Sequence, residues 1–223
     1  MGSKEKGYQL GILGGMGPLA TATLYTNIVK KTSAKCDQEH IEMVILNKCS
    51  IPDRTRAILY NEESPLDKLN EGIEELITLG CKYFIMPCNT AHSFKSGFKN
   101  LDKITFIDMI DEAVSKLSKK EKDYIVLCTN GTREVNVYNA PFLKYPNADI
   151  QNKVMDIITK TKAGLDQYDA LVSVIKDVSG NVLLACTELS IYFDRLKEEH
   201  FKYDVDDAMD ILINKTIMLC KGK

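Results

Sequence analysis

The sequence predicts an α/β fold with mostly parallel sheets, arranged in two related halves. Short apolar runs alternate with amphipathic stretches of helical period along the whole chain, an order that favours parallel strands joined by helical crossovers. Some runs, such as residues 82–87, are too uniformly apolar for a strand with one exposed face, as is typical of strands buried in a parallel sheet. The division into halves follows from an apolar strand that runs into a cysteine, once at Cys88 and once at Cys186.

Each element follows from local patterns of apolar and turn residues. We predict strands over residues 8–13, 41–46, 82–87, 104–107, 124–128 and 181–185. We predict helices over residues 18–31, 65–79, 150–162, 167–178 and 205–219. Pro18 suits the first turn of its helix, and Gly80 suits the position just beyond the last turn of the next. Residues 129–132 are expected to form a turn.

The composition is that of a globular protein with little net charge. The chain has 223 residues, of which 44% are hydrophobic and 27% are charged, a balance that excludes a disordered chain. The net charge of −2 provides no positive electrostatic potential to attract a phosphate backbone, so we expect no nucleic-acid partner. No apolar run approaches the roughly 20 residues of a membrane span, so we expect no membrane partner.

The seven cysteines are expected to be free thiols in the cytoplasm. Their number is odd, they form no Cys-x-x-Cys pair, and the charged N-terminal segment lacks the apolar core of a signal peptide. The three histidines are scattered without zinc-site spacing, so we expect no metal. Five cysteines have no special context and are expected to be small buried hydrophobes: Cys36, Cys49, Cys81, Cys128 and Cys220.

Cys88 and Cys186 stand out because their surroundings match. Each follows an apolar strand and precedes polar residues and a helical stretch, in segments 83–90 and 182–188. The carboxyl ends of parallel strands form the edge of the sheet where ligands bind. We therefore expect each half to deliver one cysteine to a shared ligand site.

Two thiols that face one cleft suggest a paired acid and base. A cysteine in the first turn of a helix has a thiolate stabilised by nearby N–H groups, which lowers the pKa of the thiol below about 8.5. Glu188 and His92 lie two and four residues beyond their cysteines and are candidate proton partners. A capping or solvated role is an equally good interpretation of either residue.

The glycine-rich segment at residues 15–20 fits part of the dinucleotide-binding fingerprint, Gly-x-Gly-x-x-Ala between a strand and a helix. The acidic residue that should follow about 20 positions later would fall in residues 37–39, which look like a loop. We therefore expect no nicotinamide site. The favoured interpretation is a turn that presents backbone N–H groups to a smaller anion, such as a carboxylate.

Four motifs together resemble the aspartate/glutamate racemase family, on its aspartate racemase branch. They are residues 14–21 (GGMGPLAT), 51–55 (IPDRT), 86–92 (MPCNTAH) and 185–189 (ACTEL). Ala185 stands where the family pattern has glycine. The resemblance implies two pseudo-symmetric domains, each a mostly parallel sheet flanked by helices, with the active site in the cleft between them. It also implies a homodimer and no cofactor.

The domain boundaries are placed where the two related halves of the sequence meet. We place the first domain at residues 1–101 plus 206–223, with Cys88, and the second at residues 102–205, with Cys186.

The resemblance implies a racemase that moves the Cα proton of an amino acid with two bases. One cysteine must be a thiolate and the other a thiol, on opposite faces of a planar carbanionic species. By resemblance, Cys186 would serve the L enantiomer and Cys88 the D enantiomer, and Glu188 would accept or orient the Cys186 proton. The donors expected for the substrate α-carboxylate are backbone N–H groups and hydroxyls at Asn89, Thr90, Thr129 and Thr187. Met16, in the glycine turn, is also expected to bind the substrate.

For the side-chain carboxylate, the family analogy points to Arg54 and Lys162. Arg54 is one of only four arginines, so planar two-point recognition has few candidates. Asp53 is expected to orient Arg54 or to contact the substrate ammonium. The expected substrate is therefore a small acidic amino acid, with aspartate placed first.

Several alternatives stay open on the same scaffold. The chain could be a glutamate or broad-specificity amino-acid racemase, or a hydantoin racemase. A decarboxylase of disubstituted malonates needs one cysteine, and the presence of two argues against it. The chain could also be a non-catalytic binding protein for an acidic amino acid.

Overall fold

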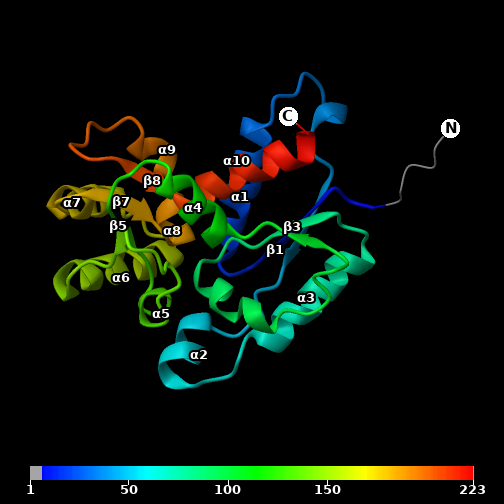
Figure 1. Ribbon diagram of the computed structural model, residues 1–223, viewed down its shortest axis with the longest axis horizontal. Helices are drawn as coiled ribbons and strands as arrows, with labels where there is room; N and C mark the ends of the chain where they lie inside the picture. Colours follow the sequence, from blue (N-terminus) through cyan, green and yellow to red (C-terminus); the bar gives the residue numbers. More distant parts are fainter. Residues whose placement is uncertain (1–6, 223) are drawn as a thin grey trace.

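The computed structural model describes residues 7–222 and contains two parallel sheets with helices packed around them (Figure 1). The first sheet holds β1 (Leu10–Gly14), β2 (Met43–Asn47), β3 (Tyr83–Ile85) and β4 (Thr105–Phe106). The second holds β5 (Tyr124–Leu127), β6 (Leu143–Lys144), β7 (Asn181–Leu184) and β8 (Val205–Asp207). The strand orders are β2-β1-β3-β4 and β6-β5-β7-β8, so the second sheet repeats the topology of the first. This repeat confirms the predicted pair of α/β halves.

The helices of the first half are α1 (Pro18–Lys31), α2 (Arg54–Tyr60) and α3 (Leu66–Thr78), with 3₁₀ turns η1 (Asp37–Glu39) and η2 (Thr90–Gly97). Helix α4 (Met109–Ser118) connects the halves. The rest are α5 (Asn130–Glu134), α6 (Ala148–Lys162), α7 (Tyr168–Asp177), α8 (Thr187–Ser190), α9 (Phe193–Leu196) and α10 (Ala208–Lys221). Figure 1 shows α6 and α7 beside the second sheet and α3 beside the first, with α1 and α10 adjacent to each other.

The predicted strands and helices are present, most of them within a few residues of the expected bounds. Pro18 begins α1, and Gly80 follows α3 with a φ of +71°, a left-handed conformation that glycine adopts without steric cost. The start of the last helix is wrong, because residues 205–207 form β8. The helix begins only at Ala208, where the Asp207 carboxylate caps it by accepting a hydrogen bond from the Asp210 N–H at 2.7 Å.

Some elements were missed from the sequence, although their capping residues are visible there. The Asp108 carboxylate accepts hydrogen bonds from the Ile110 and Asp111 N–H groups at 2.8 and 3.1 Å and so begins α4. Helix α2, which was not predicted, begins at Arg54. The predicted turn at residues 129–132 is the start of α5. Strand β6 has only two residues and leaves no periodic signal.

A core shared by both halves fixes the two sheets relative to each other. Leu10 and Ile12 of β1 belong to the same buried cluster as Tyr124 and Val126 of β5 and Leu212 of α10. Separate clusters pack the other face of each sheet, one in each half. The halves therefore share one apolar interior, and their strand ends are held at a fixed separation.

The sheets extend slightly past the domain boundaries placed from the sequence, which remain a prediction. Strand β4 pairs with β3 of the first sheet, beyond residue 101, and β8 pairs with β7 of the second sheet up to residue 207. The N-terminal segment judged unlike a signal peptide lies, as residues 1–6, outside the described residues. None of the helices in residues 7–222 combines the length and the apolar character that a membrane crossing needs.

The cysteines without a special context divide into two groups. Three are buried as predicted, and burial raises the pKa of the thiols of Cys81 and Cys220 to about 11 and of Cys128 to about 12. The prediction of burial is wrong for Cys36 and Cys49, which are exposed because they lie in surface connections that flank β2.

Asp207 makes the stability of the fold depend on pH. Its side chain is buried and accepts hydrogen bonds from the Ser190 hydroxyl and the Asp210 N–H, and burial raises its pKa from 3.8 to about 7. The folded state holds a proton that the unfolded chain releases above about pH 4. The stability contributed by this group is therefore complete below pH 4 and lost as the pH rises to about 7.

We expect Asp207→Asn, which imitates the protonated carboxyl, to remove this dependence. Denaturant unfolding at pH 4 to 8 should show the parent losing stability relative to the variant by about 1.4 kcal/mol per pH unit within that window. Parallel pH profiles for the two proteins would contradict the assignment to Asp207.

Candidate active site

The two cysteines lie at equivalent strand ends. Cys88 follows β3 and Cys186 follows β7, and each of these strands pairs with the first strand of its own sheet. The two strand ends open onto one cavity between the halves. The residues that line it are Met16, Asp53, Arg54, Thr55, Cys88, Asn89, Thr90, Thr129, Lys162, Cys186, Thr187 and Glu188. The structure thus brings together the predicted catalytic and substrate-binding residues, apart from the candidate proton partner His92, and adds Thr55, which directly follows Arg54.

The cavity between the cysteines is narrow. Its volume is about 20 Å³, which is room for about one water molecule. A chamber of about 520 Å³ adjoins it and shares Met16, Arg54, Lys162 and Glu188 with it. The other walls of the chamber come mainly from residues 15–20 and 161–164. An amino acid can therefore reach the cysteines from the chamber only if the walls of the narrow cavity move apart.

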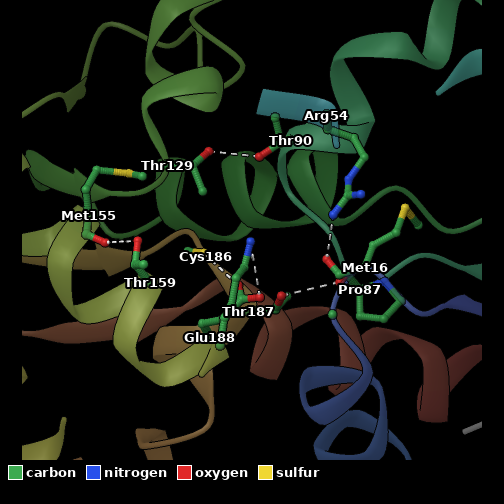
Figure 2. A network of polar contacts seen from close by, with 12 residues as sticks. Met16, Arg54, Pro87, Thr90, Thr129, Met155, Thr159, Cys186, Thr187 and Glu188 are labelled. Atoms are coloured by element: carbon green, nitrogen blue, oxygen red, sulfur yellow. Dashed lines mark hydrogen bonds and ion pairs between the residues drawn. The ribbon is translucent and has the colours of Figure 1, made fainter. Parts of the chain in front are cut away.

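Cys186 is paired with a carboxylate. Its Sγ donates a hydrogen bond to Glu188 Oε2 at 2.9 Å, and both side chains are buried (Figure 2). Burial raises the pKa of the Cys186 thiol well above its ordinary value, and the nearby Glu188 carboxylate raises it further. The expectation of a lowered pKa is therefore wrong for Cys186 in this state of the site. Its place at the start of the four-residue helix α8 does not offset the cost of ionising a buried thiol.

Lys162 is the cation next to this pair. Its Nζ lies 3.8 Å from Glu188 Oε1, and its side chain is 43% exposed at the edge of the cavity. Burial is the largest single influence on Lys162 and acts to lower its pKa, but the Glu188 carboxylate together with Cys186 and Cys88 raises it by more, so the ammonium stays protonated. Lys162 is the last residue of α6 and also lines the cavity, as the family analogy implied.

His92 supports the backbone of Cys88 and does not act on its thiol. Its Nδ1 lies 2.8 Å from the Cys88 carbonyl oxygen, and its Nε2 accepts a hydrogen bond from the Met109 N–H at 3.3 Å. When the ring is neutral and carries its proton on Nδ1, this nitrogen donates to the Cys88 carbonyl and Nε2 accepts from the Met109 N–H, so both nitrogens have a hydrogen-bond partner. Burial lowers the pKa of His92, which keeps the ring in that neutral form. Of the two candidate proton partners, only Glu188 contacts the thiol of its cysteine.

Arg54 is a buried cation held by carbonyl groups. Its Nη1 donates to the carbonyl oxygens of Ile51 and Pro52 at 3.3 and 3.0 Å, and its Nη2 donates to that of Met16 at 3.2 Å (Figure 2). No carboxylate pairs with it among the described residues, and its buried Nε has no hydrogen-bond partner there. A buried guanidinium without a counter-ion is costly, so this arrangement suits an anion that arrives from outside.

Two other predicted roles change in the structure. The Asp53 carboxylate accepts a hydrogen bond from the Arg56 N–H at 2.8 Å and so begins α2, which orients Arg54 through the helix and not by direct contact. The glycine turn does not offer the N–H of Gly15 to an anion, because this N–H donates to the Thr21 hydroxyl at 3.0 Å. The turn instead contributes the Met16 carbonyl that holds Arg54.

The threonine hydroxyls expected to bind a carboxylate are occupied. Thr90, Thr129 and Thr132 form a closed ring of hydroxyl contacts of 2.9, 2.9 and 3.1 Å. The Thr187 hydroxyl donates to the Pro87 carbonyl oxygen at 3.3 Å (Figure 2). These contacts join the first half to the second. Thr132 was missed from the sequence because nothing there shows that its hydroxyl meets Thr90 across the halves.

A family model for Asp/Glu/hydantoin racemases matches residues 13–216 of the chain. The chain belongs to this family. Among solved structures, it is similar to the aspartate racemase of Picrophilus torridus, with a TM-score of 0.84 and 32% identity over 96% of this chain and 94% of that one. An aspartate racemase homologue from Pyrococcus horikoshii OT3 shares the fold, with a TM-score of 0.71 and 21% identity over 96% of this chain and 99% of that one.

Among characterised relatives, the broad specificity amino-acid racemase RacX of Bacillus subtilis is 22% identical over 212 residues, which cover 85% of this chain and 89% of that protein. The family membership confirms the resemblance seen in the four sequence motifs. Within residues 7–222, no group of three or more His, Cys, Asp or Glu side chains is placed to hold a metal ion.

The pairing of Cys186 with Glu188 predicts the direction of a pKa change. Glu188→Gln removes the negative charge that raises the pKa of the Cys186 thiol, so the pKa should fall. The ultraviolet absorbance of thiolates, followed against pH in the parent and in Glu188→Gln, measures this. Cys186→Ser in each background identifies the contribution of Cys186. An unchanged or raised pKa in Glu188→Gln would contradict the pairing.

Proposed function

We propose that the protein interconverts L- and D-aspartate by a two-base mechanism that uses Cys88 and Cys186 and no cofactor. The observation that carries this proposal is that both cysteines, from equivalent strand ends, line one cavity with a buried Arg54 that has no carboxylate partner in residues 7–222. The aspartate racemase similarity at 32% identity supports the substrate, and the family supports racemisation in general. The proposal also includes the homodimer and the cytoplasmic location that were predicted from the sequence.

The proton transfers follow from the state of the two thiols. A two-base racemase needs one thiolate to remove the Cα proton and one thiol to return a proton to the opposite face. Cys186 carries a proton in the free protein, since burial raises the pKa of its thiol and its Sγ donates to Glu188. In the direction in which Cys186 acts as the base, its thiol first passes its proton to Glu188, and the resulting thiolate removes the Cα proton. Cys88 must then be in its thiol form, and it donates its own proton to the opposite face of Cα.

Charge on the substrate is balanced by the two cations of the cavity. Arg54 and Lys162 line the cavity and would pair with the two carboxylates of a dicarboxylate substrate. The Asp53 carboxylate, which also lines the cavity, would pair with the substrate ammonium. Removal of the Cα proton places additional negative charge on the α-carboxylate, which preorganised donors stabilise. A monocarboxylate such as alanine supplies a carboxylate for only one of the two cations, which disfavours it relative to a dicarboxylate.

Both cysteines should be required for racemisation. Cys88→Ser and Cys186→Ser should each lower the rate by several orders of magnitude, because a serine hydroxyl is a far weaker acid than a thiol. The rate is measured by separating the aspartate enantiomers over time, with EDTA present and no pyridoxal phosphate added. Cys49→Ser, at an exposed cysteine, is the matched control and should keep the parent rate. Near-normal racemisation by either active-site variant would overturn the mechanism, and activity that appears only with added pyridoxal phosphate would overturn cofactor independence.

Arg54 should determine the preference for acidic substrates. Arg54→Lys keeps the charge but loses the planar donor set, and we expect kcat/KM for aspartate to fall by about 10- to 100-fold. Arg54→Leu should abolish the preference for aspartate over alanine. Both changes remove the guanidinium that donates to the Ile51, Pro52 and Met16 carbonyls, so thermal unfolding is measured alongside.

The comparison uses L-aspartate, L-glutamate and L-alanine with each variant. Arg56→Lys, at an exposed arginine two residues along α2, is the control and should behave as the parent. A parent that prefers alanine, or a folded Arg54→Leu variant with unchanged aspartate turnover, would remove the basis for aspartate as the substrate.

A further inference from the structure

Tyr138 is a fully buried tyrosine that meets the candidate site from the second half of the chain. It follows α5, and its hydroxyl donates a hydrogen bond of 2.5 Å to Asn89 Oδ1, next to Cys88 in the first half. Burial raises the pKa of Tyr138 well above its ordinary value, so the hydroxyl keeps its proton. Asn89 is the only hydrogen-bond partner of this hydroxyl among the described residues, so the proton points toward Oδ1.

This contact fixes which way the Asn89 amide faces. A flipped amide would place its NH₂ group against a hydroxyl whose own proton would then have no acceptor. Asn89 therefore presents Nδ2 on its other side, where it is buried and has no hydrogen-bond partner. Nδ2 of Asn89 and Nε of Arg54 are two of only three buried side-chain nitrogen or oxygen atoms without a partner in residues 7–222, and both residues line the cysteine cavity.

Both of these atoms are donors, and the neighbouring hydroxyl donors are already occupied. Thr90 is engaged in the ring of threonine hydroxyls, and the Thr187 hydroxyl donates to Pro87. A buried donor without an acceptor costs free energy, which a bound carboxylate oxygen would recover.

We propose that Tyr138 is a positioning residue that locks the Asn89 amide with its NH₂ group toward the substrate, where it donates to a carboxylate oxygen. The inference rests on the proposed function and deepens it by naming how one half of the chain orients a substrate-binding group of the other. Without the Tyr138 hydroxyl, the amide is free to flip, and its carbonyl oxygen would then face the carboxylate and repel it.

The test compares Tyr138→Phe, Asn89→Ala and the double variant with the parent. Calorimetry gives the Kd for succinate, a dicarboxylate without the ammonium group, and steady-state kinetics give kcat and KM for L-aspartate. Tyr138→Phe should weaken succinate binding by about 10-fold and raise KM by a similar factor, with a smaller change in kcat. In the Asn89→Ala background, the same substitution should have no further effect, since its target is gone.

Tyr124→Phe is the matched control. Tyr124 is also fully buried, and its hydroxyl donates to Asp206 at 2.8 Å at the start of β5, the end of the strand opposite the site. It should leave both Kd and KM unchanged. The inference would be overturned if Tyr138→Phe bound succinate as the parent does. It would also be overturned if Tyr138→Phe weakened succinate binding equally in the parent and in the Asn89→Ala background. In either case, a parent that racemises aspartate would leave the proposed function in place.

A second variant decides the matter if Tyr138→Phe does not fold. Asn89→Asp keeps an oxygen for the Tyr138 hydroxyl and replaces the NH₂ group with a second oxygen, so succinate binding should be lost. Succinate binding equal to that of the parent would overturn the inference. A parent that binds succinate but racemises no acidic amino acid contradicts the proposed function alone, and a parent that does neither contradicts both.

Discussion

The hydrogen bonds that cross between the two halves at the carboxyl ends of their sheets are the constraint on which the site depends. Thr90 of the first half meets Thr129 and Thr132 of the second, and the Thr187 hydroxyl reaches back to the Pro87 carbonyl. These contacts join the loops that carry Cys88 and Cys186, above an apolar core that the two sheets share. The relative position of the two thiols is therefore set by tertiary contacts and not by either half alone.

The charges around the cysteines are not symmetric, although the strands are. Cys186 has Glu188 within hydrogen-bond distance and Lys162 beyond it, whereas Arg54, which the first half contributes to the cavity, meets only carbonyl oxygens. Duplicated topology thus provides two equivalent strand ends, and divergent side chains give them different proton and charge environments. A bound anion would complete this arrangement, because the free site holds a buried cation and unpartnered donors.

Local patterns in the sequence predicted most of the strands, the long helices and the meeting of Cys88 and Cys186, because strand ends in parallel sheets converge on one edge. Arg54 and Lys162 came from the family resemblance. Neither source predicted which pKa values would shift or which hydrogen-bond donors would be left without a partner. The pKa of Cys186 depends on burial and on Glu188, the Thr90 hydroxyl is occupied by residues about 40 positions away, and Tyr138 contacts Asn89 from 49 positions away. Such facts arise from tertiary packing, which spacing along the chain does not encode.

Two thiols that act on opposite faces of one Cα predict a specific pattern of hydrogen exchange, which tests the two-base mechanism most directly. L-Aspartate is incubated with the protein in D₂O, and both enantiomers are analysed by mass spectrometry early in the reaction. Two bases predict that the D-aspartate formed carries deuterium at Cα while the remaining L-aspartate keeps its hydrogen, because the proton removed on one face is not the one returned on the other. D-Aspartate that retains the original hydrogen, or the absence of any exchange, would contradict the account.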